Sequence, residues 1–173
     1  MLSILPAIAQ IKSANLQASG LTCAMCAKSV YKNLESLPFV DKIDTDLEKS
    51  AFLLNFKSGM PVDADLIRKK VEDAGFSVAN LTLTATFDGQ AIQADQHLTL
   101  DGRVYHFVGI SAQTLAGEKQ FSIVDKAFLT PKDAKKYAQV SKMECFKTGL
   151  AGSCCTRDSI APATRIYHVT LMP

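Results

Sequence analysis

The sequence predicts an α+β protein, in which a β-α-β-β-α-β unit over residues 10–84 is followed by a mostly β segment with one helix over residues 85–173. Strand-like and helix-like spacings of apolar residues interchange through the first half, and strand-like alternation dominates the second. With 47% apolar and 21% charged residues, the composition is that of a folded globular protein. The net charge is +2 and the longest basic run is Arg68-Lys69-Lys70, so nucleic-acid binding is not expected.

Two amphipathic helices are expected in the first half. One begins after Cys23 and ends before Pro38, and the other begins after Pro61 and Asp63 and ends at Gly75. Proline and aspartate are common at the start of a helix, and glycine at its end. Spacings of three and four residues give each helix one apolar face, made of Ala27, Val30, Leu34 and Leu37 in the first helix and Ala64, Ile67, Val71 and Ala74 in the second.

Strand signals fill the remainder of the first half. Apolar and polar residues alternate over residues 14–18, 43–47 and 52–56, and residues 76–84 supply a fourth strand. A hairpin turn is expected at Glu48-Lys49, between the second and third strands. The resulting order is strand, helix, strand, strand, helix, strand. This is the ferredoxin-like split β-α-β arrangement, in which two helices cover one face of an antiparallel sheet.

The second half is expected to consist mainly of strands. Asp101-Gly102 predicts a tight hairpin between two of them, and residues 165–171 form a closing strand. One helix is predicted from Thr130, its N-cap, to about Phe146, with Gly149 as the stop signal. Strands with one inserted helix suggest a small barrel, such as an OB-like barrel, or a sheet covered by a helix.

The motif with the most specific chemistry is Gly20-Leu21-Thr22-Cys23-Ala24-Met25-Cys26, which lies between the first strand and the first helix. Two cysteines three residues apart at this junction can direct both sulfurs to one ion. The helix dipole and the free backbone N–H groups stabilise the thiolate, which is the form that binds metal. Two thiolates with no carboxylate nearby in the sequence suit a soft ion such as Cu(I), Hg(II) or Cd(II). Lys28 could offset the negative charge of such a complex.

This motif resembles the signature of the heavy-metal-associated domain family, Gly-Met-Thr-Cys-x-x-Cys, with Leu21 in the place of methionine. Asp73-Ala74-Gly75-Phe76 is similar to the acidic-small-Gly-aromatic turn that lies beside the metal loop in that family. The resemblance covers about residues 12–84. The family includes copper chaperones, the N-terminal modules of copper-transporting P-type ATPases and the periplasmic mercury-binding protein. Because leucine is close to methionine in volume, metal binding should survive the departure.

The resemblance implies a metal-binding protein and not an enzyme. Cys23 and Cys26 would be the ligands and Phe76 would shield the site. Cu(I) is the first choice of ion, with Hg(II), Cd(II) and Zn(II) as other candidates. The function would be that of a metallochaperone or metal scavenger, and its partner a metal-transporting ATPase or another metal-binding protein. Two alternatives stay open for the same cysteines: thiol–disulfide exchange in an oxidoreductase, and a structural disulfide.

Three further cysteines lie in the second half: Cys145, Cys154 and Cys155. In an oxidising compartment, a disulfide from Cys145 to one of the adjacent pair would join the helix to the following loop and leave one thiol unpaired. The alternative is a second metal site made of all three thiols and completed by a histidine. His106 and His168, each preceded by a tyrosine, are interpreted as half-buried, hydrogen-bonded residues of their strands, with a shared ligand site as the less favoured alternative.

Residues 1–9 are expected to be the remnant of a secretion signal. A short apolar run and Pro6 precede Ala7-Ile8-Ala9, the small-x-small pattern that a signal peptidase cleaves. Export would place the protein in a bacterial periplasm or outside the cell, where cysteine pairs can oxidise. No later apolar run reaches the eighteen residues of a membrane span.

Overall fold

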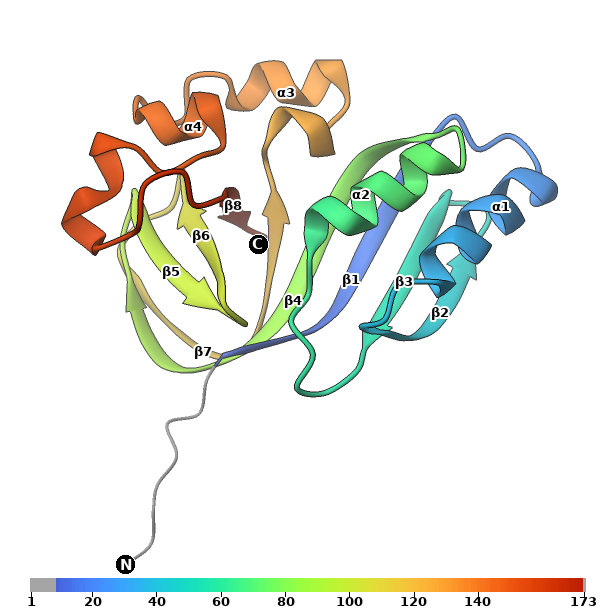
Figure 1. Ribbon diagram of the computed structural model, residues 1–173, viewed down its shortest axis with the longest axis horizontal. Coiled ribbons are helices and arrows are strands. Elements are labelled where there is room, and N and C mark those ends of the chain that lie inside the picture. The colour runs from blue at the N-terminus through green and yellow to red at the C-terminus, as the bar shows by residue number, and fades with distance from the viewer. Residues whose placement is uncertain (1–8, 173) are drawn as a thin grey trace, which may run out of the picture.

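A computed structural model describes residues 9–172, and its strands form a single eight-stranded sheet in the order β2-β3-β1-β4-β7-β8-β6-β5 (Figure 1). The expected signal-peptide remnant is residues 1–9, of which residues 1–8 lie outside the described part. The elements are β1 (Gln10–Ser19), α1 (Ala24–Glu35), β2 (Val40–Asp46), β3 (Ala51–Phe56), α2 (Ala64–Asp73), β4 (Ser77–Ile92), β5 (Gln96–Leu100), β6 (Arg103–Phe107), β7 (Gln113–Ile123), η1 (Lys126–Phe128), α3 (Pro131–Tyr137), α4 (Glu144–Thr148), η2 (Ser153–Asp158) and β8 (Ile166–Leu171).

The first half has the predicted β-α-β-β-α-β order, with antiparallel pairing of β2 with β3, β3 with β1 and β1 with β4. Helices α1 and α2 lie beside each other over one face of these strands (Figure 1). Each begins at a residue whose side chain accepts a backbone N–H, Cys23 for α1 and Asp63 for α2. Gly75 follows α2 with φ of +88°, a left-handed conformation that glycine adopts without steric cost. The ferredoxin-like fold of this half is therefore confirmed.

Strand β4 continues past Thr84, where a strand end was expected, as far as Ile92. It pairs with β1 over residues 77–86 and with β7 over residues 82–92, so its continuation is hydrogen-bonded to β7. A register shift between Phe87 and Gln90 bends it without ending it. The expected boundary between residues 84 and 85 consequently falls inside β4, and both halves of the chain share one sheet.

The second half is mostly β, as predicted, but two details of the prediction are wrong. The helix expected from Thr130 to Phe146 is two short helices, α3 and α4. Between them the Ser141 hydroxyl accepts the backbone N–H of Met143, and such a local bond competes with helical pairing. The OB-like barrel is also not formed, because the described strands make an open sheet with β2 and β5 at its edges. Gly149 ends α4 as expected, with φ of +72°.

Strands β6 and β8 run parallel, with Tyr105 opposite Tyr167 and His106 opposite His168. Because side chains alternate along a strand, the tyrosines and the histidines lie on opposite faces. The tyrosines belong to the large apolar core that also contains the inner faces of α1 and α2. The histidine face carries a second, smaller core under α4 and η2, made of Val104, Cys145, Ala151, Cys155 and Ile166.

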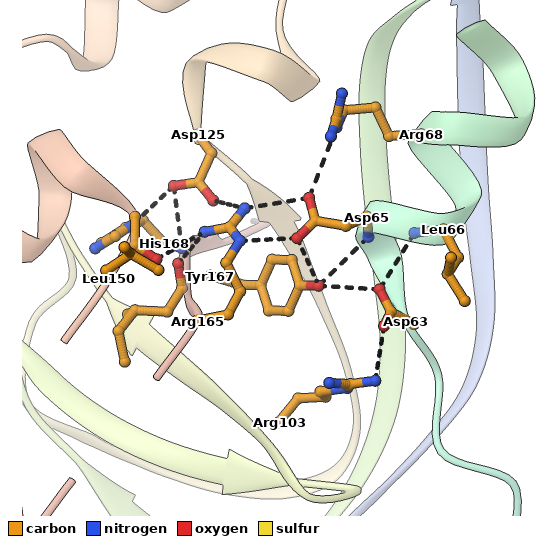
Figure 2. Close-up of polar contacts among 12 residues, drawn as sticks. Asp63, Asp65, Leu66, Arg68, Arg103, Asp125, Leu150, Arg165, Tyr167 and His168 are labelled. Atoms are coloured by element: carbon orange, nitrogen blue, oxygen red, sulfur yellow. Dashed lines mark hydrogen bonds and ion pairs between the residues drawn. The ribbon is translucent and has the colours of Figure 1, made fainter. Parts of the chain in front are cut away.

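Polar contacts join α2 to the second half of the chain (Figure 2). Arg165 Nε lies 2.8 Å from Asp65 Oδ2, and Arg103 Nη2 lies 2.7 Å from Asp63 Oδ2. The Tyr167 hydroxyl donates to both carboxylates, at 3.2 Å from Asp63 Oδ1 and 3.1 Å from Asp65 Oδ2. The N-terminal turn of α2 is thus held against β6 and β8. Among the helices of residues 9–172, none is long and apolar enough to cross a membrane.

Candidate metal centres

The first candidate centre is the Cys23–Cys26 pair at the start of α1. Cys23 is the N-cap of the helix in extended backbone conformation, and its sulfur accepts the backbone N–H of Cys26 at 3.2 Å. The two Cα atoms are 5.2 Å apart, and the two sulfurs are in disulfide contact. Cys23 is exposed and Cys26 half-buried, so the pair can be reached from solvent. Once reduced, it presents two thiolates where the backbone N–H groups of a helix start stabilise negative charge.

The residues around this pair lie as the family resemblance implies. Gly20 has φ of +85°, and a Cβ added there would lie 3.9 Å from the Phe76 ring. Phe76 is therefore close to the metal loop and half-buried. Leu21 packs against the main core, which explains why an aliphatic side chain can replace methionine at this position. Met25 lies between the cysteines but is 73% exposed and points to solvent.

This donor set suits a soft cation. The two sulfurs come from one loop and one helix turn, and a two-coordinate ion between them would be accessible from outside. A pocket of about 200 Å³ lies beside Cys23, lined in part by the turn between β2 and β3. Lys28 is exposed, one turn into α1, and is available to offset the charge of a dithiolate complex.

The second candidate centre brings Cys145, Cys154 and Cys155 together with two histidines. All three thiols are free, and their sulfurs lie within 4.8 Å of one another. His97 Nε2 lies 3.5 Å from the Cys155 sulfur and 4.0 Å from the Cys145 sulfur. His106 Nδ1 lies 3.7 Å from the Cys145 sulfur. We call these five residues the Cys/His cluster.

The Cys/His cluster is built from two layers. His97 on β5 pairs directly with His106 on β6, and their rings stack with centroids 4.5 Å apart. The cysteines come from α4 and η2, which cover this face of the sheet. Cys145 and Cys155 are fully buried and Cys154 is half-buried, so the cluster is largely closed to solvent.

Each histidine of the cluster also contacts a carboxylate through its other ring nitrogen. His97 Nδ1 lies 2.6 Å from Asp158 Oδ2, and His106 Nε2 lies 3.1 Å from Asp95 Oδ1. Burial, and then the nearby rings of His168 and His97, lower the pKa of His106 to about 4. The His106 ring is therefore neutral at physiological pH. A neutral imidazole is the form that binds a metal.

A third histidine, His168, lies beside the Cys/His cluster and also contacts a carboxylate through one ring nitrogen. His168 on β8 has its Nδ1 2.6 Å from Asp125 Oδ1, and its ring meets the His106 ring edge-to-face at 5.0 Å. Asp125 also contacts Arg165, at 2.9 Å, so it links His168 to the ion pairs of α2 (Figure 2). The buried His168 Nε2 has no hydrogen-bond partner among the described residues.

The sequence placed the three cysteines of the second half together but did not identify the histidines. His106 and His168 are hydrogen-bonded strand residues, as interpreted, yet they are fully buried, and His106 also faces a thiol. His97 was given no role. The repeated Tyr-His pairs at 105–106 and 167–168 were the available signal, because they place both histidines on one face of neighbouring strands.

The comparisons with known proteins concern the first half of the chain. Residues 15–77 match the model of the heavy-metal-associated domain. Among curated proteins, the probable copper-transporting ATPase HMA5 of Arabidopsis thaliana is 37% identical over 70 residues, which are 40% of this chain and 7% of the ATPase. The chain thus spans a small fraction of that relative.

Three solved structures are among those similar to this chain. The yeast copper transporter domain Ccc2a is 28% identical over 39% of this chain and 90% of its own, with a TM-score of 0.35. A copper binding domain from the P-type ATPase HMA7 is 28% identical over 39% of this chain and 89% of its own, with a TM-score of 0.36. CopP from Helicobacter pylori is 30% identical over 39% of this chain and 98% of its own, with a TM-score of 0.34. The family match and the observed β-α-β-β-α-β fold agree on the same segment, and they support metal binding by it. Residues 15–77 of this protein are a heavy-metal-associated domain.

Proposed function

We propose that this protein is a carrier or scavenger of a soft metal ion, which the thiolates of Cys23 and Cys26 bind. The observation that carries the proposal is the placement of both sulfurs at the N-terminus of α1 inside the segment that matches the heavy-metal-associated domain. Cu(I) is the proposed ion, because two thiolates suit a soft monovalent cation and the relatives of this segment are named for copper. In this proposal the protein has no catalytic activity.

Metal transfer in this proposal proceeds by ligand exchange. A thiolate of a partner protein binds the ion while one of the two cysteines leaves it, and a second exchange completes the transfer. Each step forms one metal–sulfur bond and breaks another, so the charge of the ion is unchanged. The exposed position of Cys23 favours attack from outside. The proposed partner is a metal-transporting ATPase or another metal-binding protein.

Titration of the fully reduced protein with Cu(I) against a chromogenic Cu(I) chelator tests the assignment. The unmodified protein is expected to take Cu(I) from the chelator, and the Cys23→Ser/Cys26→Ser variant is expected to lose its tightest site. Met25→Ala is the matched control, because Met25 lies between the cysteines but is largely exposed. An unchanged tightest site in the double serine variant would overturn the proposal.

The second candidate function is a thiol–disulfide oxidoreductase that uses the same pair. The disulfide contact between Cys23 and Cys26 favours this function, because it shows that the two sulfurs are close enough to form a disulfide. A redox enzyme needs a reduction potential near that of its compartment and turnover with a disulfide substrate. Measured insulin reduction together with weak Cu(I) affinity would favour this function over the carrier.

We also propose export to a periplasm or the extracellular space, on the basis of the sequence pattern at Pro6 to Ala9 alone. N-terminal sequencing of protein recovered from a periplasmic fraction tests it. A mature chain that begins at Gln10 is expected, and protein that keeps residues 1–9 and stays in the cytoplasmic fraction would contradict export.

A further inference from the structure

We propose that the second half of this protein binds a Zn(II) ion with four ligands: His97 Nε2, His106 Nδ1, and the sulfurs of Cys145 and Cys155. This site is separate from the Cys23–Cys26 pair in sequence, donor set and burial. It differs from the three-thiol site expected from the sequence, since two of its ligands are histidines. In this arrangement Cys154 is a neighbour of the site and not a ligand.

The distances between the donor atoms fit tetrahedral zinc. With Zn–S of about 2.3 Å and Zn–N of about 2.0–2.1 Å, tetrahedral angles put sulfur and nitrogen ligands about 3.6 Å apart and two sulfurs about 3.8 Å apart. Three of the four nitrogen–sulfur pairs among the proposed ligands are 3.5, 3.7 and 4.0 Å apart: His97–Cys155, His106–Cys145 and His97–Cys145. The Cys145 and Cys155 sulfurs are within 4.8 Å of each other, as are the facing nitrogens of His97 and His106. Cys145 is shared by both sets of neighbouring donor atoms, one with His97 and His106 and one with the other two cysteines, so the proposed ion lies beside its sulfur.

The hydrogen bonds of the two histidines aim the correct nitrogens at the sulfurs. Asp158 accepts a hydrogen bond from His97 Nδ1–H and Asp95 accepts one from His106 Nε2–H, so the lone pair of each ring lies on the nitrogen that faces the cluster. Carboxylate–histidine–metal arrangements of this kind fix the tautomer and the orientation of a ligand. Asp158 and Asp95 are thus positioning residues for the site.

Burial and charge select the ion. Cys145, Cys155 and His106 are fully buried, and a buried site is costly unless its charges cancel. Zn(II) with two thiolates and two neutral imidazoles has no net charge, whereas Cu(I) with the same ligands would carry one negative charge. Two sulfurs and two imidazoles are also the ligands of closed structural zinc sites.

In the proposed site Cys154 lies beside the ligands and is not one of them. It accepts the backbone N–H of Cys145 at 3.3 Å and lies 3.5 Å from the Cys155 sulfur. A sulfur in this position supports the start of α4. Cys154 is also less buried than the two proposed cysteine ligands, whose sulfurs are the ones with hydrogen-bond contacts to histidine nitrogens among the described residues.

The test uses the full chain with Cys23→Ser and Cys26→Ser, so that the first site cannot bind, and Co(II) as a spectroscopic replacement for zinc. The reduced variant is expected to bind one Co(II), with the intense visible absorption of a tetrahedral ion and a thiolate-to-cobalt band in the near ultraviolet, and Zn(II) should displace it.

Adding Cys155→Ser or His106→Gln should weaken Co(II) binding at least tenfold, whereas Cys154→Ser, the matched control, should keep the same spectrum and stoichiometry. Asp158→Asn should weaken affinity by about 10- to 100-fold with little change in the spectrum.

A second measurement does not depend on the folding of any ligand variant. It is X-ray absorption of the zinc-loaded Cys23→Ser/Cys26→Ser protein, in which all four proposed ligands are intact. A first shell of two sulfurs and two nitrogens is expected. A shell with three sulfurs, a shell without sulfur, or a variant that binds Cu(I) tightly but no Zn(II) would overturn the assignment. These outcomes are independent of Cu(I) binding at Cys23 and Cys26, so the two proposals can fail separately.

Discussion

Arg165, which directly precedes β8, and Asp65 on α2, one hundred residues apart in the sequence, form an ion pair at 2.8 Å that ties the heavy-metal-associated domain to the second half of the chain (Figure 2). Arg165 Nη2 also lies 2.9 Å from Asp125 Oδ2, and its guanidinium stacks over the Tyr167 ring at 4.3 Å. One guanidinium therefore pairs with two carboxylates, one on α2 and one just after β7. This arrangement makes the two halves depend on each other for stability.

Replacing Arg165 with glutamine should destabilise the whole protein. The substitution leaves Asp125, whose side chain is 11% exposed, without this cation and leaves Asp65 with Arg68, whose Nε lies 3.6 Å from Asp65 Oδ1. Loss of a buried partner costs about 3–5 kcal/mol, and partial exposure of Asp65 reduces the expected loss to about 1–3 kcal/mol. Urea unfolding measures it. Lys69→Gln is the control, because Lys69 pairs with Asp73 on the exposed face of the same helix and should cost under about 0.5 kcal/mol. If Arg165→Gln and Lys69→Gln lowered the unfolding free energy equally, the buried position of the Arg165–Asp65 ion pair would not matter for stability.

The same pair predicts how stability depends on pH. Burial opposes ionisation of Asp65, but the hydrogen bond and charge of Arg165 outweigh it, so the pKa of Asp65 is lowered below 3.8. A carboxyl group whose pKa is lower in the folded than in the unfolded protein stabilises the fold when the pH is above its unfolded-state pKa. That stabilisation is lost as the pH falls through its folded-state pKa. The unfolding free energy of Asp65→Asn should therefore change less steeply than that of the unmodified protein below about pH 4.

Asp101 provides a control of opposite sign for this pH experiment. Its burial raises the pKa of its carboxyl group, although its side chain accepts the Ile11 backbone N–H. In the folded state Asp101 takes up its proton at higher pH than in the unfolded chain, so it favours the fold as the solution is acidified. Asp101→Asn should make the loss of stability in acid steeper. If Asp65→Asn and Asp101→Asn change the slope in the same direction, this account of the two carboxyls is wrong.

Much of the first half could be predicted from the sequence because its signals are local. The caps Cys23 and Asp63 and the apolar spacing of each helix lie within a few residues of the elements that they define. The end of β4 was missed because its continuation depends on pairing with β7, more than twenty residues later. No short window of sequence contains that information.

The Cys/His cluster could be predicted only in part, for a similar reason. Cys154 and Cys155 are adjacent and Cys145 is close to them in the sequence, so their proximity was evident. His97 and His106 meet across a hairpin, but α4 and η2 reach them only because β8 inserts in parallel beside β6. Long-range strand order, which residue spacing does not encode, decides that histidines and thiols face each other.

Tyr105 and Tyr167 offer a comparison between two stacked, buried tyrosines with different hydroxyl environments. Their rings are 5.5 Å apart. The Tyr167 hydroxyl contacts Asp63 and Asp65, whereas the buried Tyr105 hydroxyl has no hydrogen-bond partner in the described structure. Tyr167→Phe should cost about 1–2 kcal/mol, because it removes a bond to charged groups, and Tyr105→Phe should be neutral or stabilising. Thermal or urea unfolding of both variants checks this, and a larger loss for Tyr105→Phe would contradict it.

The thiols of the second half should differ in reactivity in the order of their burial. Cys145, Cys154 and Cys155 are all free, but Cys154 alone is partly exposed. Alkylation of the native protein, prepared without reductant and without added metal, should modify Cys154 about tenfold or more faster than the other two, because a buried thiol is shielded from the reagent. Alkylation in denaturant should then modify all three, and Cys154→Ser should remove the fast phase. Mass spectrometry of the peptides would contradict the prediction if it found Cys145 joined to either neighbour, since that disulfide would remove two of the thiols on which the Cys/His cluster depends.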